Sequence, residues 1–535
     1  MALGAILVGL VLLGGFVFLR ACGGSECVDV YCPSDRNIAA PEGYEFASRI
    51  FELNPEATPT QPGFDLQVQA ALTREATDGQ LLSFFRYDET AQRWDPIAPA
   101  VVDAQGRVAT ATFKEAPAVM AVLRRMTPGG VLVAYLPHNA TLHREAQPHV
   151  TIVHPLDFAP NADGTIGGEL SSTVAQGRGY EVYPVIAANA SVQGQVAVVE
   201  SLLADARSRT NHVQQILAKV NELGLRGIDI AYLDLPATQR TSFTLFVGEL
   251  ADALHAQGRQ LTLTLPSPIK TQNRIDEGAY DYAELAKRAD LIKIAPYRDQ
   301  ATFRLVMSEV LQFLTERVTP SKLVLTVSPY STETGGDVIG RLTLVDAMNI
   351  ATRISVRAQA EAITTSTQVD VAGTNIDRDE GLTGLRWYPE TATVAFSYKQ
   401  PQGGGSRTVY IENVFSIGFK LELIPTYRLG GVAVEDASEN VLLGNIWPAI
   451  IPFVTSGLPT LTQPNAEDLK PRWAASGGNM EDTGRGSARW FTPSQPGTYT
   501  ISLTLSDGVA LFENSVEVVV RQREAATTPT PGSGN

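Results

Sequence analysis

The chain has 535 residues, more than one hydrophobic core ordinarily organises, so several domains are expected. Hydrophobic residues make up 44% and charged residues 19% of the chain, a composition that excludes intrinsic disorder throughout. The formal net charge of -15 opposes association with a phosphate backbone, so nucleic acid is not expected as a partner.

The beginning of the chain predicts export. Residues 2–19 contain no charged side chain, and about 18 apolar residues suffice to cross a bilayer as a helix. The sequence Leu19-Arg20-Ala21-Cys22 resembles a bacterial lipobox, from which Arg20 departs. Two alternatives follow: residues 1–21 are a signal peptide that ends at a lipidated Cys22, or they are an uncleaved membrane anchor. Both place the rest of the chain outside the cytoplasm, held at the membrane by its N-terminal segment.

The three cysteines all lie in residues 22–40, which are predicted to be a linker. Cys27 and Cys32 are suited to form a small disulfide in an oxidising compartment, which leaves Cys22 for lipid. No histidine lies near them in sequence, which disfavours a zinc site. The chain also lacks the glycine motifs of nucleotide-binding loops, so neither a metal nor a cofactor is expected.

Residues 41–126 contain short alternating segments separated by turn signals. Phe64–Gln69 and Val108–Phe113 alternate with period two, which is typical of strands with one buried face. The pattern predicts an antiparallel β-sandwich for this part of the chain.

Residues 128–450 change to buried strands that alternate with amphipathic helices. Eight apolar strands are predicted, at Val131–Tyr135, Val150–His154, Glu181–Ile186, Gly227–Leu233, Gln260–Leu265, Leu291–Ala295, Leu323–Val327 and Gly431–Val434. The helices are expected at Val196–Arg207, Val213–Leu223, Thr241–Ala256, Phe303–Arg317 and Ile417–Tyr427. Continuous apolar strands that alternate with helices predict a (β/α)8 barrel. The long gap before the eighth strand predicts an α+β insertion at about 330–415.

Residues 455–522 return to strand patterns. Thr498–Leu505 and Ser515–Val520 alternate, and Pro496-Gly497 and Asp507-Gly508 flank the first of them. This part resembles PKD-type and other immunoglobulin-like repeats, which implies a C-terminal β-sandwich. Residues 523–535 have the composition of a disordered tail.

Residues Arg226–Pro236, with the sequence RGIDIAYLDLP, carry a specific resemblance. They are similar to the fourth-strand motif Asp-Gly-x-Asp-x-Asp-x-Glu of glycoside hydrolase family 18, in the branch that includes spore-cortex hydrolases. Residues 131–137 and 281–297 resemble the first-strand and sixth-strand regions of the same family. The resemblance implies a barrel that acts on polymers containing N-acetylglucosamine, such as chitin or peptidoglycan, by substrate-assisted hydrolysis.

The motif lacks the acids on which that activity depends. The glutamate that protonates the leaving oxygen is replaced by Leu233, the aspartate two residues earlier by Ala231, and the first aspartate by Arg226. Only Asp229 remains. A leucine side chain has no proton to donate, and loss of a general acid typically removes about 10²–10⁴-fold of the rate. No catalytic residue is therefore expected.

Three carboxylates are weak candidates for a displaced catalytic group: Asp229, Asp234 and Glu435. Side chains alternate along a strand, so Asp229, Ala231 and Leu233 are predicted to face the barrel interior and Asp234 to face away. Glu435 follows the eighth strand, where an acidic pair with Asp229 is one interpretation, and a buried Asp229 held by local hydrogen bonds is the favoured one.

Several residues of the predicted barrel and its insertion are candidates for glycan binding. Aromatic side chains stack on sugars and amides bond their hydroxyls. The predicted substrate-binding set is Tyr135, Asn189, Asp229, Tyr297 and Trp387. Tyr297 matches a tyrosine that the resemblance implies for the acetamido group, but Arg298 replaces the aspartate beside it. His138 follows the first strand and is interpreted as a residue of the rim.

Three functions remain open. The first is a non-hydrolytic barrel, anchored at the cell surface, that binds a cell-wall or extracellular glycan or serves as an envelope scaffold. The second is an active glycoside hydrolase on N-acetylglucosamine polymers with a displaced carboxylate. The third is a structural component that assembles with envelope proteins. The missing acid at Leu233 favours the first.

Overall fold

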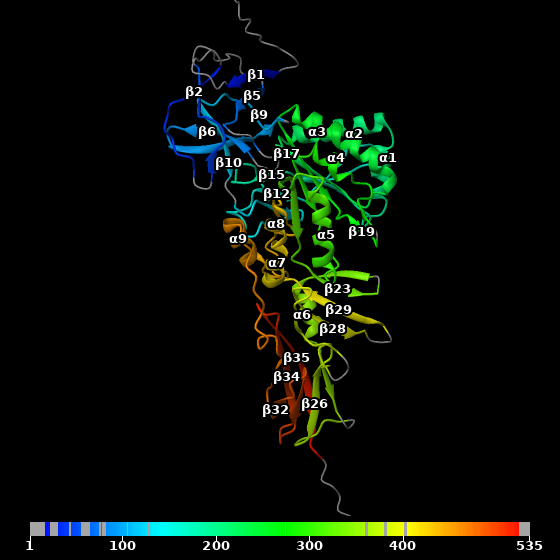
Figure 1. Ribbon diagram of the computed structural model, residues 1–535. Coiled ribbons are helices and arrows are strands. Elements are labelled where there is room, and N and C mark those ends of the chain that lie inside the picture. Colours follow the sequence, from blue (N-terminus) through cyan, green and yellow to red (C-terminus); the bar gives the residue numbers. More distant parts are fainter. Residues whose placement is uncertain are drawn as a thin grey trace, which may run out of the picture.

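The computed structural model describes residues 16–21, 30–41, 44–54, 65–73, 76, 82–103, 105–125, 128–272, 274–336, 338–358, 362–378, 382–400 and 404–523. Figure 1 shows an elongated molecule with the N-terminal sheet beside one end of a helix-covered barrel and the C-terminal strands beyond the other end.

A nine-segment parallel sheet forms the centre of the molecule. Its hydrogen-bonded order is β15-β12-β11-β30-β22-β21-β18-β17-β16. The segments are β11 (Val131–Leu136), β12 (Ile152–Pro155), β15 (Glu181–Val182), β16 (Val185–Ala188), β17 (Gly227–Tyr232), β18 (Gln260–Leu265), β21 (Leu291–Ile294), β22 (Leu323–Val327) and β30 (Gly431–Val434).

The two ends of this sheet belong to one interrupted strand. Only Tyr183-Pro184 separates β15, which pairs with β12, from β16, which pairs with β17. The main chain at the break still bonds both neighbours, because Tyr183 N donates to Val153 O at 3.0 Å and Pro184 O accepts from Asp229 N at 3.0 Å. Eight parallel strands therefore close on themselves, consistent with a TIM barrel.

Helices cover the outside of the barrel. They are α1 (Gln195–Leu203), α2 (Ala206–Glu222), α3 (Arg240–His255), α4 (Tyr282–Ala286), α5 (Phe303–Thr315), α7 (Val414–Leu421), α8 (Leu423–Tyr427) and α9 (Trp447–Ser456), with 3-10 turns at Ala237–Gln239 and Pro320–Lys322. Short two-residue strands also occur after the second and fifth strands: β13 (Ala159–Pro160) with β14 (Ile166–Gly167), and β19 (Ile269–Lys270) with β20 (Ile275–Asp276).

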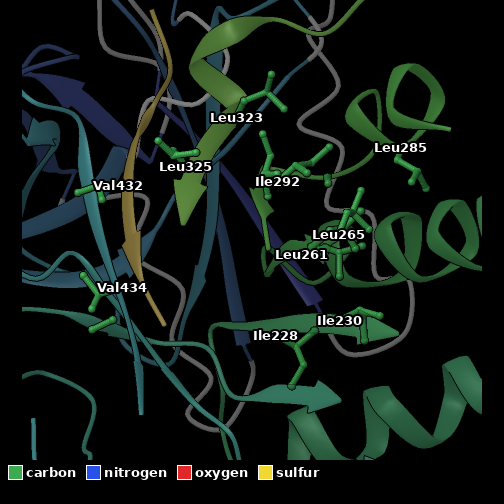
Figure 2. Packing of buried hydrophobic residues seen from close by; sticks show 14 of the residues in the cluster. Ile228, Ile230, Leu261, Leu265, Leu285, Ile292, Leu323, Leu325, Val432 and Val434 are labelled. Atoms are coloured by element: carbon green, nitrogen blue, oxygen red, sulfur yellow. The ribbon is translucent and has the colours of Figure 1, made fainter. Parts of the chain in front are cut away.

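The strands follow the alternation expected for a barrel. Ile228 and Ile230 belong to the apolar layer between strands and helices, which also contains Leu285 of α4 (Figure 2). Side chains of the other parity, such as Val133 and Ala231, form a separate cluster inside the barrel. The sequence of β17 thus points its polar Asp229 inward.

The N-terminal region is one curled sheet rather than the predicted two-sheet sandwich. Its path is β7-β6-β10-β4-β2-β1-β5-β9-β8, with β3 paired to β10. The strands are β1 (Phe16–Ala21), β2 (Tyr31–Pro33), β3 (Tyr44–Phe46), β4 (Phe51–Leu53), β5 (Asp65–Ala71), β6 (Leu82–Asp88), β7 (Arg93–Pro99), β8 (Val101–Val102), β9 (Val108–Phe113) and β10 (Val119–Arg125). The sheet is curled, so that β7 near one end of it contacts β9 near the other. The concave side encloses an apolar cluster.

The predicted export segment is only partly described. Its last residues form β1, which pairs in parallel with β5 along its whole length. No helix in the described ranges is long and apolar enough to cross a membrane. Cys32 lies in β2 and is disulfide-bonded, while Cys22 and Cys27 lie outside the described residues.

The segment between β22 and α7 is called the insertion below. It contains a five-stranded antiparallel sheet in the order β24-β23-β29-β28-β27 and one helix, α6 (Leu344–Ala351), whose apolar face packs on it. The strands are β23 (Ser331–Gly335), β24 (Val338–Leu342), β27 (Arg386–Tyr388), β28 (Thr393–Lys399) and β29 (Ser406–Ile411). The predicted hairpin is the β28–β29 pair.

The C-terminal strands form two facing sheets, one of which is shared with the insertion. The sheet β31-β34-β35 contains β31 (Arg472–Ala475), β34 (Gly497–Ser506) and β35 (Leu511–Val520). The other, β25-β26-β33-β32, joins β32 (Asn479–Asp482) and β33 (Ser487–Phe491) to β25 (Ile354–Arg357) and β26 (Gln368–Gly373). A module confined to 455–522 is therefore incomplete, because two of its strands precede the eighth barrel strand.

Candidate functional site

The barrel mouth is formed by the residues that follow the carboxyl ends of the strands. It includes Asn189, Leu233, Arg298, Ser328 and Glu435. In parallel barrels this end carries the binding and catalytic groups, because the loops that vary lie there. The insertion leaves the barrel from the same end, after β22.

Asp229 lies inside the barrel below the mouth and is fully enclosed. Its side chain and that of Lys293 on β21 are both 0% exposed, and the Lys293 ammonium donates to Asp229 Oδ1. Thr262 Oγ1 donates to Oδ1 at 2.7 Å, and Thr264 Oγ1 donates to Oδ2 at 2.6 Å. Because Thr264 donates to the carboxylate, its oxygen accepts from the Tyr135 hydroxyl, which extends the chain of hydrogen bonds to β11.

The protonation states of Asp229, Lys293 and His154 depend on one another and on burial. Burial alone would raise the pKa of Asp229, but the charge and hydrogen bond of Lys293 and the Thr264 hydroxyl hold that pKa below its ordinary value. Burial lowers the pKa of Lys293 to about 8, and Asp229 opposes that change. Burial and the Lys293 charge lower the pKa of His154 to about 4, so this imidazole is neutral. Asp229 is thus an ionised core residue and has no proton to give.

The motif positions two and four residues beyond Asp229 carry no acid. Ala231 is 5% exposed and packs inside the barrel, and Leu233 is half-buried at the end of β17. Asp234 is exposed and adopts φ 60°, a left-handed turn conformation. Its Oδ2 accepts from Ala190 N at 3.0 Å, so the carboxylate ties two loops together.

Glu435 occupies the mouth but is bound by two arginines. Its Oε1 accepts from Arg298 Nη2 at 2.7 Å and from Arg341 Nη1 at 3.2 Å, and its Oε2 accepts from Ser328 Oγ at 2.5 Å. Its side chain is 16% exposed. Two guanidinium groups and one hydroxyl therefore occupy its two oxygens, which holds the carboxylate in a fixed network. Asp229 bonds Lys293 and Glu435 bonds arginines, so the acidic pair interpreted from the sequence is not formed.

The other four predicted binding residues lie in different places and do not form one site. Tyr135 is buried inside the barrel. Asn189 at the rim accepts from its own loop at Ser191 N, 2.9 Å away. Tyr297 bonds the hydroxyl of Thr302 at 3.0 Å and lines a hollow of about 370 Å³ beside the β18–β19 loop. Trp387 lies on β27 of the insertion and contacts Phe419, so it is not part of the mouth.

His138 lies at the rim with Asp157 and Ser171. Its Nδ1 lies 2.7 Å from Asp157 Oδ1, which also accepts from Ser171 Oγ at 2.6 Å. The serine hydroxyl is directed to the carboxylate rather than to a free histidine nitrogen, so this trio does not have the geometry of a nucleophilic triad.

Sequence reasoning missed Lys293, Ser328 and Arg341. Lys293 had a usable signal, because a lysine of the same parity as Leu291 in a buried strand must find a partner inside the barrel. Ser328 follows β22 and had the weaker signal of its position at a strand end. Arg341 lies on β24 of the insertion, and no local pattern predicts that this hairpin reaches the mouth.

The fold defines the class as a parallel barrel of the TIM type, with its strand ends open to one mouth. Residues 190–439 match the family described as "Glycosyl hydrolases family 18". This match covers 250 of the 535 residues and includes five of the eight barrel strands, from β17 to β30.

Known proteins resemble parts of the chain. A protein of Bacillus subtilis named as a sporulation-specific glycosylase, YdhD, is 27% identical over 177 residues, which cover 31% of this chain. The match spans 42% of the length of that relative. The spore cortex-lytic enzyme SleL of Bacillus megaterium is 15% identical with a TM-score of 0.46 and covers 63% of this chain and 77% of its own. A chitinase from Chromobacterium violaceum is 19% identical with a TM-score of 0.45, over 60% of this chain and 98% of its own.

Proposed function

We propose that this barrel binds a cell-wall or extracellular glycan at its mouth without hydrolysing it. The observation that carries the proposal is Leu233, an alkyl side chain at the position where the family motif has its proton donor. The match of residues 190–439 to the family 18 model, and a relative named as a sporulation-specific glycosylase, support N-acetylglucosamine polymers as the ligand class.

The state of the nearby carboxylates supports the same proposal. Asp229 is paired with a buried lysine, Asp234 holds a loop, and Glu435 is bound by two arginines. General acid catalysis requires a protonated group within hydrogen-bond reach of the leaving oxygen. Each of these three side chains is therefore held by structural contacts with neighbouring residues.

The test uses the full-length chain with an N-acetylglucosamine hexasaccharide and with purified peptidoglycan glycan strands. Isothermal titration is expected to show saturable binding, and reducing-end assays are expected to show no turnover. Turnover that is lost in Asp234→Asn or Glu435→Gln would contradict the proposal and identify a displaced acid. Absence of binding to every glycan would favour a structural role in assembly with envelope proteins.

A second experiment restores the missing acids. The double substitution Ala231→Asp with Leu233→Glu returns both carboxylates to their motif positions on β17. A general acid typically contributes about 10²–10⁴-fold, so hydrolysis of the hexasaccharide is expected to become measurable above the unsubstituted chain. The single substitution Leu233→Gln, which matches the shape without the acid, is the control.

We further propose that the chain acts outside the cytoplasm and is held at the membrane by residues 1–21 or by lipid on Cys22. The apolar composition of residues 2–19 supports this location. The pairing of residues 16–21 with β5 means that either form of anchoring would remove β1 from the N-terminal sheet. Mass spectrometry of the peptide that contains Cys22, from the native membrane fraction, is expected to reveal either diacylglycerol on Cys22 or an intact N-terminal segment.

A further inference from the structure

Strand β35 forms one edge of the three-stranded C-terminal sheet β31-β34-β35, at the end of the molecule away from the N-terminal sheet (Figure 1). It has ten residues, Leu511–Val520, and pairs with β34 along its whole length. An edge strand presents one row of backbone N–H and C=O groups that its own sheet does not use. The residues that form this row decide what the edge can bind.

The row that faces away from β34 is called the outer row below. In an antiparallel pair, residues alternate between bonding the neighbouring strand and facing away from it. Arg521 faces away, because its N donates to Ile363 O at 2.8 Å and its O accepts from Thr365 N at 2.9 Å. Counting back from Arg521 in steps of two gives the members of the outer row in β35: Leu511, Glu513, Ser515, Glu517 and Val519. Their side chains are all exposed.

The outer row is open along most of its length. The segment 363–365 bonds it at Arg521, so the edge already accepts a strand of its own chain at one end. Within the described part of the chain, no backbone group outside β34 bonds residues 511–519 of the row. Ser515 N donates to Asn514 Oδ1 at 2.9 Å, an exposed contact that a docked strand can replace. Strand β25 contacts β35 but pairs with β26.

The side chains of the outer row are acidic near the centre and apolar at the ends. Glu513 and Glu517 lie four residues apart on the same face, and neither forms an ion pair with another described residue. Leu511 and Val519 flank them and are 65% and 60% exposed. Long edges are commonly protected by lysine, proline or a bulge. The ten described residues of β35 contain none of these features.

The charges of the outer row select among partners. A second copy of the chain that paired antiparallel along the whole edge, centred on Ser515, would place Glu513 opposite Glu517. Like charges directly opposite each other are unfavourable. An extended segment with two cations four residues apart would instead place a cation opposite each glutamate. Apolar residues beyond those cations would pack on Leu511 and Val519.

We propose that the outer edge of β35 binds an extended basic segment of a partner protein by strand addition. Backbone hydrogen bonds to the outer row supply the affinity, and Glu513 and Glu517 select the sequence. The side-chain pattern of the row is the same read from either end, so it fits a strand in either direction. This site is separate from the barrel mouth and does not depend on the proposed function.

The first test titrates the full-length chain with a labelled nine-residue peptide, Val-Thr-Lys-Thr-Ser-Thr-Lys-Thr-Val, and follows fluorescence anisotropy. Saturable binding is expected. The double substitution Glu513→Gln with Glu517→Gln is expected to weaken binding by about twofold to thirtyfold, because each cross-strand ion pair contributes modestly. The matched control is Glu467→Gln with Glu481→Gln, which removes the same charge from exposed side chains outside β35. This control is expected to bind as the unsubstituted chain does.

The second test concerns the backbone of the outer row. The N–H of Ser515 faces away from β34, so Ser515→Pro leaves the pairing with β34 intact while its ring obstructs a docked strand. Binding is expected to fall by about tenfold or more. Peptides N-methylated at every second residue, prepared in both frames, are expected to lose binding to the unsubstituted chain in one frame only. These peptides test strand addition without any change to the protein.

Three outcomes would overturn the proposal. The first is full binding of the N-methylated peptides in both frames, or unchanged affinity in Ser515→Pro when its thermal unfolding is also unchanged. The second is equal affinity for a peptide with glutamate in place of both lysines, which would exclude selection by charge. The third is dimerisation of the full-length chain that Ser515→Pro abolishes, which would make a second copy the occupant of the edge.

Discussion

Lys293 and Asp229 form an ion pair at the centre of the barrel, where neither side chain reaches solvent. Burying two charges is costly, and their mutual attraction offsets that cost only while both are present and hydrogen-bonded. The two threonine hydroxyls complete the shell of the carboxylate. Asp229, the one motif acid that remains on β17, is therefore a residue of the barrel core.

Breaking this pair on one side is expected to destabilise the barrel strongly. Lys293→Met leaves Asp229 buried without its cation, which typically costs about 3–5 kcal/mol. The double substitution Lys293→Met with Asp229→Leu removes both charges and is expected to cost less than the single one. Urea unfolding followed by circular dichroism measures both. Lys270→Met serves as a control, because its pair with Glu309 is partly exposed and contributes at most about 1 kcal/mol.

His154 makes stability depend on pH. Its pKa is about 4 in the folded chain against an ordinary 6.5, so the unfolded chain binds more protons between these values. Its contribution is fully present above pH 6.5 and is lost as the pH falls towards 4, by about 3 kcal/mol in total. Thermal unfolding between pH 7 and pH 4 is expected to show a smaller loss in His154→Asn than in the unsubstituted chain. Parallel curves for the two proteins would contradict this assignment.

At the scale of elements, the barrel closes where β30 meets β11. Gly431 has φ 154°, and a Cβ there would lie 2.1 Å from Val131 O. Strand β30 pairs with both β11 and β22, so a displacement at this residue disturbs two strand pairings at once.

Gly431→Ala is therefore expected to destabilise the barrel by more than about 3 kcal/mol, since neither the strand nor its neighbour can move without losing hydrogen bonds. The comparison is Gly248→Ala within α3, where a new Cβ meets only Arg288 Nε at 3.9 Å. That substitution is expected to stabilise the chain by roughly 0.5–1 kcal/mol, because alanine is the better helix former. Denaturant unfolding midpoints of the two variants are expected to shift in opposite directions, down for Gly431→Ala and up for Gly248→Ala.

The strands of the barrel were predictable because their apolar runs are continuous. Gln260–Leu265, Leu323–Val327 and Gly431–Val434 agree with the structure to the residue. The third strand differs, because Pro184 offers no N–H and interrupts the ladder. The alternation of side chains along β17 predicted that Asp229 and Ala231 face the barrel interior, and the structure confirms this.

Long-range contacts were beyond sequence reasoning. The contact of Arg341 with Glu435 requires the insertion to fold back over the mouth. The predicted insertion at about 330–415 included Trp387, but its pairing within β27 and β28, away from the mouth, had no local signal. The sharing of β25 and β26 with the C-terminal strands is likewise a contact between segments far apart in sequence.

At the scale of the whole molecule, the C-terminal strands depend on the insertion. Val369 and Val371 of β26 share an apolar cluster with Trp490 and Val518. A fragment of residues 455–523 lacks β26, so it loses one side of that core and the partner of β33. It is expected to be unfolded, with an amide proton spectrum of narrow dispersion, whereas the full-length chain shows dispersed signals. A well-dispersed spectrum from the fragment would show that it folds alone.

The same sharing sets the timing of folding during synthesis. Strand β26 ends at Gly373, but β33 begins only at Ser487, after the last barrel strand has been made. Ribosomes add about 5–20 residues per second, so β26 waits on the order of ten seconds with one edge open. An open edge invites pairing with other chains. A nascent chain released at about residue 480 would therefore be prone to aggregate although its barrel is complete.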